Sequence, residues 1–432
     1  MLHRAEDRRG RATVVVLLAV AATIATLAGA TTSGAATPAP VASRSPSLRS
    51  TLPTSPPIHP VTPGDATVRL TWDPPRSGTA VTGYRVARRA FSAASGTWGA
   101  WQTTDLSAGA TGHVWSGLTN GRQTQVRVAA QDAGAWGPYS PARTATPSAR
   151  LIDRGIRSQV RTAYRHRLVP ALRVPNRWTG SVAHCRAGTN SAAYRRATRD
   201  AVNYMRAMSD VGPVTFARRF NSKAQRAALM MQANGQLSHD PPKTWRCYSA
   251  AGHQAAASSN LASGVAGPQA IAMYMSDPGD GNTAAGHRRW ITYPRQKVMG
   301  TGDTSLANDL WVFGTWARRN PAGTPAYQAW PNAGYFPREL EPGGRWSLTS
   351  TRGASFARAR VRVVGPGGTP VGLIQYPDAP GYGDNTVVWQ LKKVPSRSIA
   401  GARRYTVHVT GITSPHGSTV SHVYRITLFS AA

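Results

Sequence analysis

Glutamate is nearly absent from this chain of 432 residues. It occurs only as Glu6, Glu339 and Glu341, so the stretch from 151 to 338 contains none. A carboxylate usually accompanies paired histidines in hydrolases, as a metal ligand or as a general base. The absence of glutamate therefore argues against a hydrolytic histidine site in that stretch.

Long apolar runs are also scarce, and the one candidate lies at the N-terminus. Arginines between Arg4 and Arg11 precede an apolar run over 12–27, which is short for a membrane span. Small residues and a stretch rich in proline, serine and threonine follow it. We therefore expect a signal peptide over residues 1–30, cleaved near residue 30 or 35, and a flexible linker over 31–60. No other transmembrane segment is expected, which predicts a mature protein outside the cytoplasmic membrane.

Cysteine is limited to Cys185 and Cys247. In an exported protein two cysteines are expected to form a disulfide, which would contribute about 4 kcal/mol in the chain-entropy model. Metal binding by the two thiols is the less favoured alternative, because oxidation competes outside the cell.

Acidic residues are few, at 18 Asp and Glu against 51 Lys and Arg, and the formal net charge is +33. Such a surface attracts polyanions such as teichoic acids, acidic glycans, anionic lipid or nucleic acid. The basic residues are spread over every segment, which favours a compositional habit over a dedicated patch. No motif for specific nucleic-acid recognition accompanies them.

Residues 61–147 have the pattern of an all-β domain. Short alternating runs are separated by Pro-Pro, Ser-Gly and Asn-Gly turns, which predicts a β-sandwich. The region resembles a fibronectin type III domain, although Thr124 stands where that family usually has a tyrosine. The resemblance is carried by the residues at 70–75, 83–86, 117–121 and 134–140. It implies a spacer or adhesive module.

Two further regions flank the middle of the chain. Residues 148–184 are rich in arginine and predict a basic linker, part of which has the apolar spacing of a short helix. Residues 326–432 contain several runs that alternate with period two, separated by glycine-rich turns. They predict a second β-sandwich.

Residues 185–320 change to helices followed by strands. Asn221 is the expected N-cap of one helix and Gly235 its end, while Pro268 stands at the start of another. The expected elements are helices at 197–208, 221–235 and 269–275 and strands at 298–301 and 310–315.

Two short segments of this middle region each carry a histidine. His239 lies in Gly-Gln-Leu-Ser-His-Asp-Pro-Pro and His287 in Gly-His-Arg-Arg-Trp. Two imidazoles can hold a divalent metal or perform acid–base chemistry. A single histidine is more often a hydrogen-bonded structural residue, so the surroundings of the pair decide its role. His184 and His253 are weaker candidates and are expected at the surface.

The same region resembles the CAP superfamily of cysteine-rich secretory, antigen 5 and pathogenesis-related proteins. The family's pieces occur in order at 203–207, 213–214, 227–239, 258–262, 286–288 and 300–302. The resemblance implies an α-β-α sandwich with a central cleft. In that family the cleft holds two histidines and two acidic residues and can bind zinc or another divalent ion.

Carried over to this chain, the resemblance implies an incomplete site. His239 and His287 match the two histidines, and Ser259 takes the place of the first acid. For the second acid only Asp277 and Asp280 are available. Without a fixed carboxylate, a pair of histidines predicts weak metal binding and no general base other than a histidine.

We therefore expect a secreted protein, extracellular or attached to the cell envelope, with a CAP-like domain between two β-sandwiches. The favoured function is binding of a glycan, lipid or protein in or near the cleft. One alternative is a metal-dependent or wall-polysaccharide hydrolase that uses both histidines, and another is a basic adhesin for anionic wall polymer. A serine hydrolase is not favoured, because neither Ser258 nor Ser259 lies in a Gly-x-Ser-x-Gly motif.

Overall fold

The structure is a computed structural model that describes most of the chain after residue 51. The expected signal peptide and the linker up to residue 51 lie outside the described residues. No helix within the described part has the length and apolar character needed to cross a membrane. The described residues are 52–76, 80–132, 134–148, 151–321, 323–393, 395 and 401–432.

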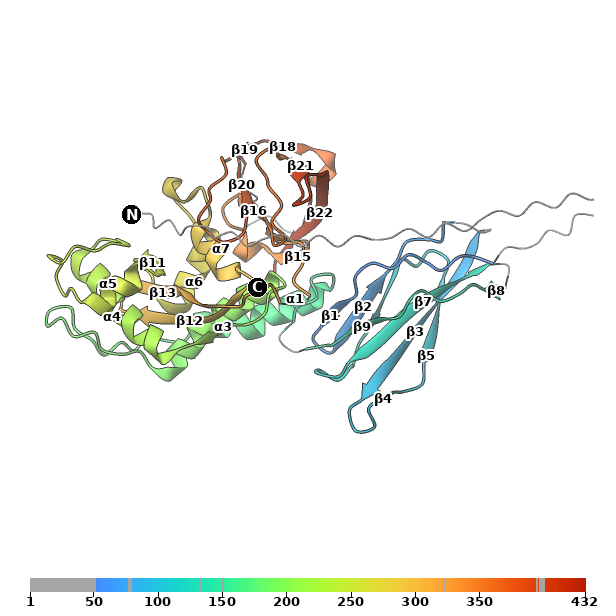
Figure 1. Cartoon of the computed structure of the whole chain (residues 1–432), viewed down its shortest axis with the longest axis horizontal. Helices are drawn as coiled ribbons and strands as arrows, with labels where there is room; N and C mark the ends of the chain where they lie inside the picture. The colour runs from blue at the N-terminus through green and yellow to red at the C-terminus, as the bar shows by residue number, and fades with distance from the viewer. Residues whose placement is uncertain are drawn as a thin grey trace, which may run out of the picture. The chain divides into compact units, whose positions relative to one another are not determined.

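The first described domain is a sandwich of two β-sheets, as predicted (Figure 1). One sheet has the order β1-β2-β6, and the other is β4-β3-β7-β8 with β5 and β9 paired to β3 and β7. Their inward side chains form a separate core, in which the rings of Trp72 and Tyr84 lie 5.3 Å apart. Thr124 is buried at the start of β7, so the sandwich forms without the family's tyrosine. The strands are β1 (Thr62–Gly64), β2 (Thr67–Thr71), β3 (Val81–Ser92), β4 (Thr97–Trp98), β5 (Gln102–Ser107), β6 (Gly112–Trp115), β7 (Thr124–Asp132), β8 (Ala135–Trp136) and β9 (Arg143–Ala145).

The expected basic linker is a packed helical segment in its central part. It carries α1 (Arg157–Ala163), the π-helical turn η1 (Tyr164–Leu168) and α2 (Val169–Leu172). Val160 and Leu168 have no exposed surface and belong to the largest hydrophobic core. Arg157 and Arg165 in the same turns are exposed, so a strongly basic composition concealed an amphipathic segment.

The middle domain has a four-stranded sheet of order β10-β12-β13-β11. Strands β12 and β13 form an antiparallel hairpin, β11 pairs antiparallel with β13, and β10 pairs parallel with β12. The strands are β10 (Thr215–Phe216), β11 (Ser259–Ser263), β12 (Gln296–Asp303) and β13 (Ala307–Trp316). The helices are α3 (Ala192–Met208), α4 (Arg218–Asn234), α5 (Ala250–Ala256), α6 (Gly267–Ser276), η2 (Asp280–Asn282) and α7 (Gly286–Thr292).

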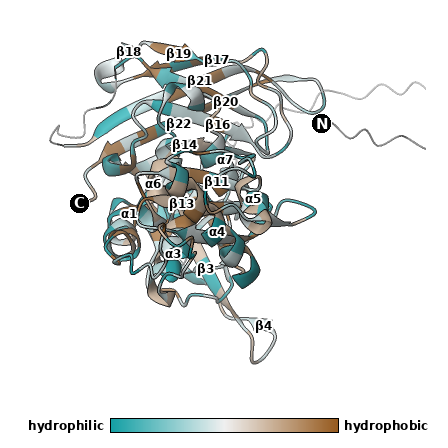
Figure 2. Ribbon diagram, turned by 90° about the vertical axis from the view of Figure 1, so that its left-hand side faces the viewer, coloured by the Kyte–Doolittle hydropathy of each residue, from teal (hydrophilic) through white to brown (hydrophobic). Residues whose placement is uncertain are grey.

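Helices cover both faces of this sheet, which confirms the expected α-β-α sandwich (Figure 1). On one face α4 and α5 pack against the sheet, where the rings of Phe220 and Trp311 stack at 4.7 Å. On the other face α3, α6 and α7 share a core with Leu310 and Val312. Residues 310–312 therefore alternate between two cores, as expected for a strand covered on both sides. Figure 2 shows the hydrophobic colouring of β13 at the centre of this region.

One detail of the middle domain differs from the sequence-based expectation. Helix α4 begins at Arg218 after Ala217, so Asn221 lies in its first turn and is not the N-cap. Its side-chain oxygen instead accepts a hydrogen bond from the Thr301 backbone N–H at 2.8 Å, which ties the helix to β12. Gly235 does end the helix, with the positive φ of 60° that favours glycine.

The C-terminal domain is a second sandwich, as predicted. Its sheets have the orders β14-β16-β20-β19 and β15-β22-β21-β17-β18. Its core is continuous with the cluster formed by α3, α6 and α7, so the last two domains share one hydrophobic interior. The elements are β14 (Tyr327–Trp330), β15 (Gly334–Pro337), η3 (Arg338–Leu340), β16 (Arg345–Ser350), β17 (Arg360–Val364), η4 (Pro366–Gly368), β18 (Pro370–Val371), β19 (Leu373–Gln375), β20 (Thr386–Leu391), β21 (Arg403–Thr413) and β22 (Thr419–Phe429).

Candidate functional site

His287 lies in the first turn of α7 and is held on two sides. Its Nδ1 lies 2.7 Å from Oδ1 of Asp277, and its ring stacks on Tyr274 with centroids 5.2 Å apart. The Tyr274 hydroxyl is itself fixed, because it donates to the Asn308 side-chain oxygen at 2.9 Å. The imidazole is 25% exposed, so it is oriented by buried groups but remains accessible on one edge.

Asp277 is the acid that reaches a histidine. It ends α6 with a φ of 51°, which turns its fully buried carboxylate back towards α7. There its second oxygen accepts the Arg288 backbone N–H at 3.3 Å. Asp280 lies three residues further on, exposed on η2. Of the two aspartates considered for the second acidic position, the structure places Asp277 against His287.

Arg288 also stabilises the region where the end of α6 meets α7. Its buried guanidinium donates to the carbonyl of Met275 at 2.7 Å and to the Ser347 hydroxyl at 3.0 Å. These contacts tie α7 to the end of α6 and to the C-terminal sandwich. Desolvation lowers the pKa of Arg288 to about 10, and the nearby Asp277 carboxylate opposes that shift.

His239 lies in the exposed loop that follows α4. Its Nδ1 is 2.8 Å from the carbonyl oxygen of Ala256 at the end of α5. The predicted Cys185–Cys247 disulfide is present and fastens the same loop region from its far end. Neighbouring Asp240 is not directed at His239 but lies 2.7 Å from Nε2 of His253 at the surface. His184, beside the disulfide, is exposed as expected.

The two histidines line the same space. Both border a cavity of about 280 Å³ that also includes Ser259, Asn260 and Tyr382. Both also border an adjoining cavity of about 360 Å³ with Tyr274 and Asp277 in its wall. The order of the family's motifs predicts that His239 and His287 form a pair, and in the structure both residues border the same cavities. We call this space the histidine cleft.

Ser259 is the first residue of β11 and stands at the position of the family's first acid. Its side chain contacts another acid, Asp309. Its hydroxyl donates to Oδ1 of Asp309 at 2.6 Å, and Asp309 is completely buried. Within the described residues the second Asp309 oxygen has no hydrogen-bond partner. Burial raises the pKa of Asp309 well above its ordinary value, because a charged carboxylate there would lack compensation.

Sequence reasoning missed Asp309, and it offered no signal for it. A polar residue within a run that alternates is ordinarily the exposed one, yet here helices cover both faces of β13. A second buried acid, Asp303, accepts hydrogen bonds from Asn308 Nδ2 at 2.7 Å and from the Gly267 N–H at 2.5 Å. Desolvation raises the pKa of Asp303 to about 6. The middle sheet therefore holds two buried carboxyl groups, Asp303 and Asp309, whose pKa values are raised by desolvation.

Aromatic rings form the rim of the smaller cavity. Trp290 packs edge-on against Phe313 at 4.6 Å and lies parallel to Trp316 at 5.7 Å. Tyr382, from a turn of the C-terminal sandwich, covers the start of α7 so closely that a Cβ on Gly286 would lie 2.6 Å from its ring. Phe313 and Trp316 are each 43% exposed and Tyr382 is 39% exposed. Rings half open to solvent beside a cavity are a ligand-binding arrangement.

The hydrogen bonds indicate the tautomer of each neutral imidazole. The Ala256 carbonyl and the Asp277 carboxylate are acceptors, so both neutral imidazoles carry their proton on Nδ1. Nε2 of each ring then presents a lone pair, able to accept a ligand hydroxyl or bind a metal. A metal fits this donor set only as a two-nitrogen site completed by water or ligand oxygen. Within the described residues no cluster of three or more His, Cys, Asp or Glu side chains has metal-site geometry.

Comparison with known proteins identifies two of the domains. Residues 199–314 match the model of the CAP, cysteine-rich secretory protein family, and residues 53–146 match that of the fibronectin type III domain. A search of curated proteins found no match. Among solved structures, the FN5 domain of Drosophila Lar is 19% identical, with a TM-score of 0.19, and the match covers 22% of this chain and 98% of that one. The third fibronectin III domain of human KIAA0343 protein is 19% identical, with a TM-score of 0.21, over 25% and 94%.

Proposed function

Since this chain contains a CAP domain and a fibronectin type III domain, we propose that it is a secreted interaction protein that binds a glycan in the histidine cleft. One observation carries the proposal: His239 and His287 border the same cavity, and each uses its Nδ1 on a protein acceptor. Two Nε2 lone pairs are thereby left as oriented acceptors for hydroxyl groups. A glycan presents many hydroxyl donors and so suits this arrangement.

The aromatic rim supports a sugar as the ligand class. A sugar ring has apolar C–H faces that pack against exposed aromatic rings, while its hydroxyls form hydrogen bonds at the edges. Trp290, Phe313 and Tyr382 border the same cavity as the histidines, together with Asn260 and Asn282. Neutral acceptors, amides and rings suit an uncharged saccharide better than an anion.

Calorimetric titration of the full chain with a soluble oligomer of N-acetylglucosamine tests this proposal. We expect saturable binding that the His239→Ala/His287→Ala double variant weakens by about tenfold or more, because two hydrogen bonds are lost. His253→Ala is the matched control, since that half-buried histidine borders neither cavity. Equal affinities for the wild type and the double variant would refute a role for the cleft.

Divalent metal is a second ligand for the same site, expected to bind weakly. Carboxylate-oriented histidines are typical metal ligands, and Asp277 orients His287 in that way. Titration with zinc alone should give one weak site that the double histidine variant lacks. Zinc binding that survives in the double variant would place the metal elsewhere.

A hydrolase remains the alternative function, and the His287–Asp277 pair favours it. A histidine whose Nδ1–H is held by a buried carboxylate can act as a general base through Nε2. Incubation of the chain with wall glycan, followed by chromatography of the products, distinguishes the two. Turnover that is lost in both His287→Ala and Asp277→Asn would establish the enzyme.

The third possibility is a basic adhesin that holds anionic wall polymer by charge alone. Its support is the formal net charge of +33. Retention on isolated cell walls would then fall steeply with salt and be unchanged in the double histidine variant. Fractionation of cells that produce the full chain tests secretion and wall attachment directly.

A further inference from the structure

The most exposed aromatic side chains of this protein gather in one place. Among the described residues, the three most exposed phenylalanine, tyrosine and tryptophan side chains are Phe313, Trp316 and Tyr382. Phe313 and Tyr382 border the smaller cavity of the histidine cleft. Trp316 borders neither cavity, but its ring contacts that of Phe313 with centroids 6.0 Å apart. Exposed apolar surface is unfavourable in water, so its concentration at one site indicates a surface that binds a ligand.

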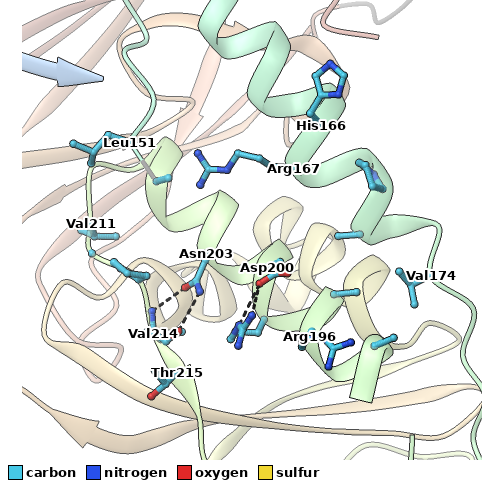
Figure 3. Close-up of a pocket in the computed structure, with 18 residues that line it drawn as sticks. Leu151, His166, Arg167, Val174, Arg196, Asp200, Asn203, Val211, Val214 and Thr215 are labelled. Carbon is cyan, nitrogen blue, oxygen red and sulfur yellow. Dashed lines mark hydrogen bonds and ion pairs between the residues drawn. The ribbon is translucent and has the colours of Figure 1, made fainter. Parts of the chain in front are cut away.

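A larger cavity lacks this feature. It has a volume of about 660 Å³ and lies beside α3, as Figure 3 shows. Its described lining residues include no phenylalanine, tyrosine or tryptophan, and the apolar ones among them are small or aliphatic, such as Leu151, Val211 and Val214. Exposed rings are therefore a property of the histidine cleft and not of cavities in general.

Buried rings hold Phe313 and Trp316 in place. The ring of Trp290 on α7 contacts both, at 4.6 Å from Phe313 and 5.7 Å from Trp316, and it is itself buried. Tyr293, also buried, meets Trp316 at a steep angle with centroids 5.6 Å apart. A ligand therefore meets two exposed rings that are already ordered, which lowers the entropic cost of binding. We call Phe313 and Trp316 the aromatic track.

We propose that the ligand of the histidine cleft is a polysaccharide chain, with one sugar unit in the cleft beside Phe313 and the next on Trp316. The inference rests on the proposed glycan binding in the cleft and adds a second sugar subsite outside both cavities. The spacing of 6.0 Å along the aromatic track is about the length of one sugar unit in a chain. Each ring can pack against the apolar C–H face of a sugar while the hydroxyls stay in water.

Trp316 is the residue that makes the site select for chain length. It ends β13 beyond the matched CAP region, which stops at residue 314. Because it lies outside the cavities, a short saccharide held by the histidines does not reach it. Only a longer chain gains the additional contact, so affinity should rise with length.

Calorimetry on the full chain with the disaccharide and the tetrasaccharide of N-acetylglucosamine tests the proposal. We expect the tetrasaccharide to bind about tenfold more tightly, as one additional contact between a sugar and a ring predicts. Trp316→Ala should bring its affinity close to that of the disaccharide. Disaccharide binding should be unchanged in this variant, which also shows that the variant folds. Trp316→Phe keeps a ring and should retain most of the advantage.

The matched control is Ile374→Ala, which removes an exposed apolar side chain of β19 that borders neither cavity. It should keep the full advantage of the tetrasaccharide. Equal losses in Ile374→Ala and Trp316→Ala would overturn the second subsite. Light scattering at the same concentration tests a competing occupant, a second copy of the chain. Self-association that Trp316→Ala abolishes would assign the aromatic track to that contact and overturn the proposal.

The double histidine variant separates this inference from the proposed function. If that variant loses disaccharide binding while the tetrasaccharide advantage survives in Trp316→Ala, the cleft binds a glycan and the second subsite is wrong. If neither saccharide binds the wild type, both the proposed function and the second subsite are wrong. Loss of the advantage in Trp316→Ala alone, with disaccharide binding intact, supports both.

Discussion

The two histidines of the cleft are held in different ways. His287 is oriented by side chains: a fully buried carboxylate on Nδ1 and a stacked tyrosine ring. His239 is oriented by backbone, through one carbonyl of α5, and stands in an exposed loop that the Cys185–Cys247 disulfide fastens. One imidazole therefore belongs to the folded core, and the other depends on how well a loop is anchored.

This difference suggests separate roles for His287 and His239 in binding a ligand. A group fixed by buried partners keeps its geometry whether or not a ligand is present, which favours a defined first contact. A group on an anchored loop can adjust to ligands of different shape at a small entropic cost. We infer that His287 sets the position of a ligand and that His239 closes on it.

Removal of the disulfide should have the largest effect on this comparison. The Cys185→Ser/Cys247→Ser variant loses a cross-link spanning 62 residues, and the chain-entropy model gives a loss of about 4 kcal/mol in the free energy of unfolding. Hydrogen exchange should rise most in the loop that carries His239. Urea denaturation and exchange mass spectrometry measure both.

The same variant contains an internal control. Protection of α7 and of the His287 environment should change only by the global loss of stability. If α7 loosened more than the loop at 235–249, the disulfide would not be the specific anchor of His239.

Asp277→Ala should be the next largest change, at about 3 kcal/mol of unfolding free energy. It leaves the His287 Nδ1–H and the Arg288 N–H without their buried acceptor. It also removes the negative charge that lies near the buried guanidinium of Arg288. Urea denaturation gives the value. Asp280→Ala, three residues along and exposed, should stay within about 0.5 kcal/mol. A similar loss in both variants would show that Asp277 has no special role.

The fold of the middle domain was predictable because its signals are local. The stripe on α3, the glycine that ends α4 and the short runs at 298–301 and 310–315 that predicted β12 and β13 are all readable over a few residues. Strand β11, with the sequence Ser-Asn-Leu-Ala-Ser, has no such pattern. Its conformation is set by pairing with β13, and this is a tertiary effect.

The site was predictable only as far as its residue types were distinctive. Histidines at family positions could be paired, and the second acid could be narrowed to two aspartates. Choosing Asp277 needed the positive φ that turns its side chain towards α7. Asp309 was not predicted. The sequence shows that Ser259 stands at the position of the family's first acid, but it does not show that Asp309 contacts Ser259 in the fold. The prediction of Asn221 as an N-cap was wrong because its side chain accepts a hydrogen bond from β12, whereas an N-cap side chain bonds to the backbone of its own helix.

The buried acids make stability depend on pH, with Asp309 as the test. Its folded pKa is raised above the unfolded value, so the folded chain binds more protons between the two values. Stability is then greatest below about pH 4 for this group and falls as the pH rises, by up to about 1.4 kcal/mol per unit. Asp303, with a folded pKa of about 6, acts in the same direction.

Asp309→Asn should therefore flatten this dependence. The amide keeps an oxygen for the Ser259 hydroxyl but cannot ionise. Unfolding free energies between pH 5 and pH 8 should decline less steeply than in the wild type, whereas Asp280→Asn should leave the slope unchanged. An identical slope for Asp309→Asn and the wild type would mean that Asp309 ionises without penalty in the folded protein.

The smallest expected effect separates the two histidines directly. His239→Ala removes an exposed side chain with one backbone bond, so its unfolding free energy should change by less than about 0.5 kcal/mol. His287→Ala leaves Oδ1 of the buried Asp277 carboxylate without its donor and removes a stacked ring, so it should lose about 1–3 kcal/mol. Paired denaturation curves decide the matter. Equal losses of unfolding free energy would mean that the loop holds His239 as firmly as the core holds His287. The inference of separate roles for the two histidines would then be wrong.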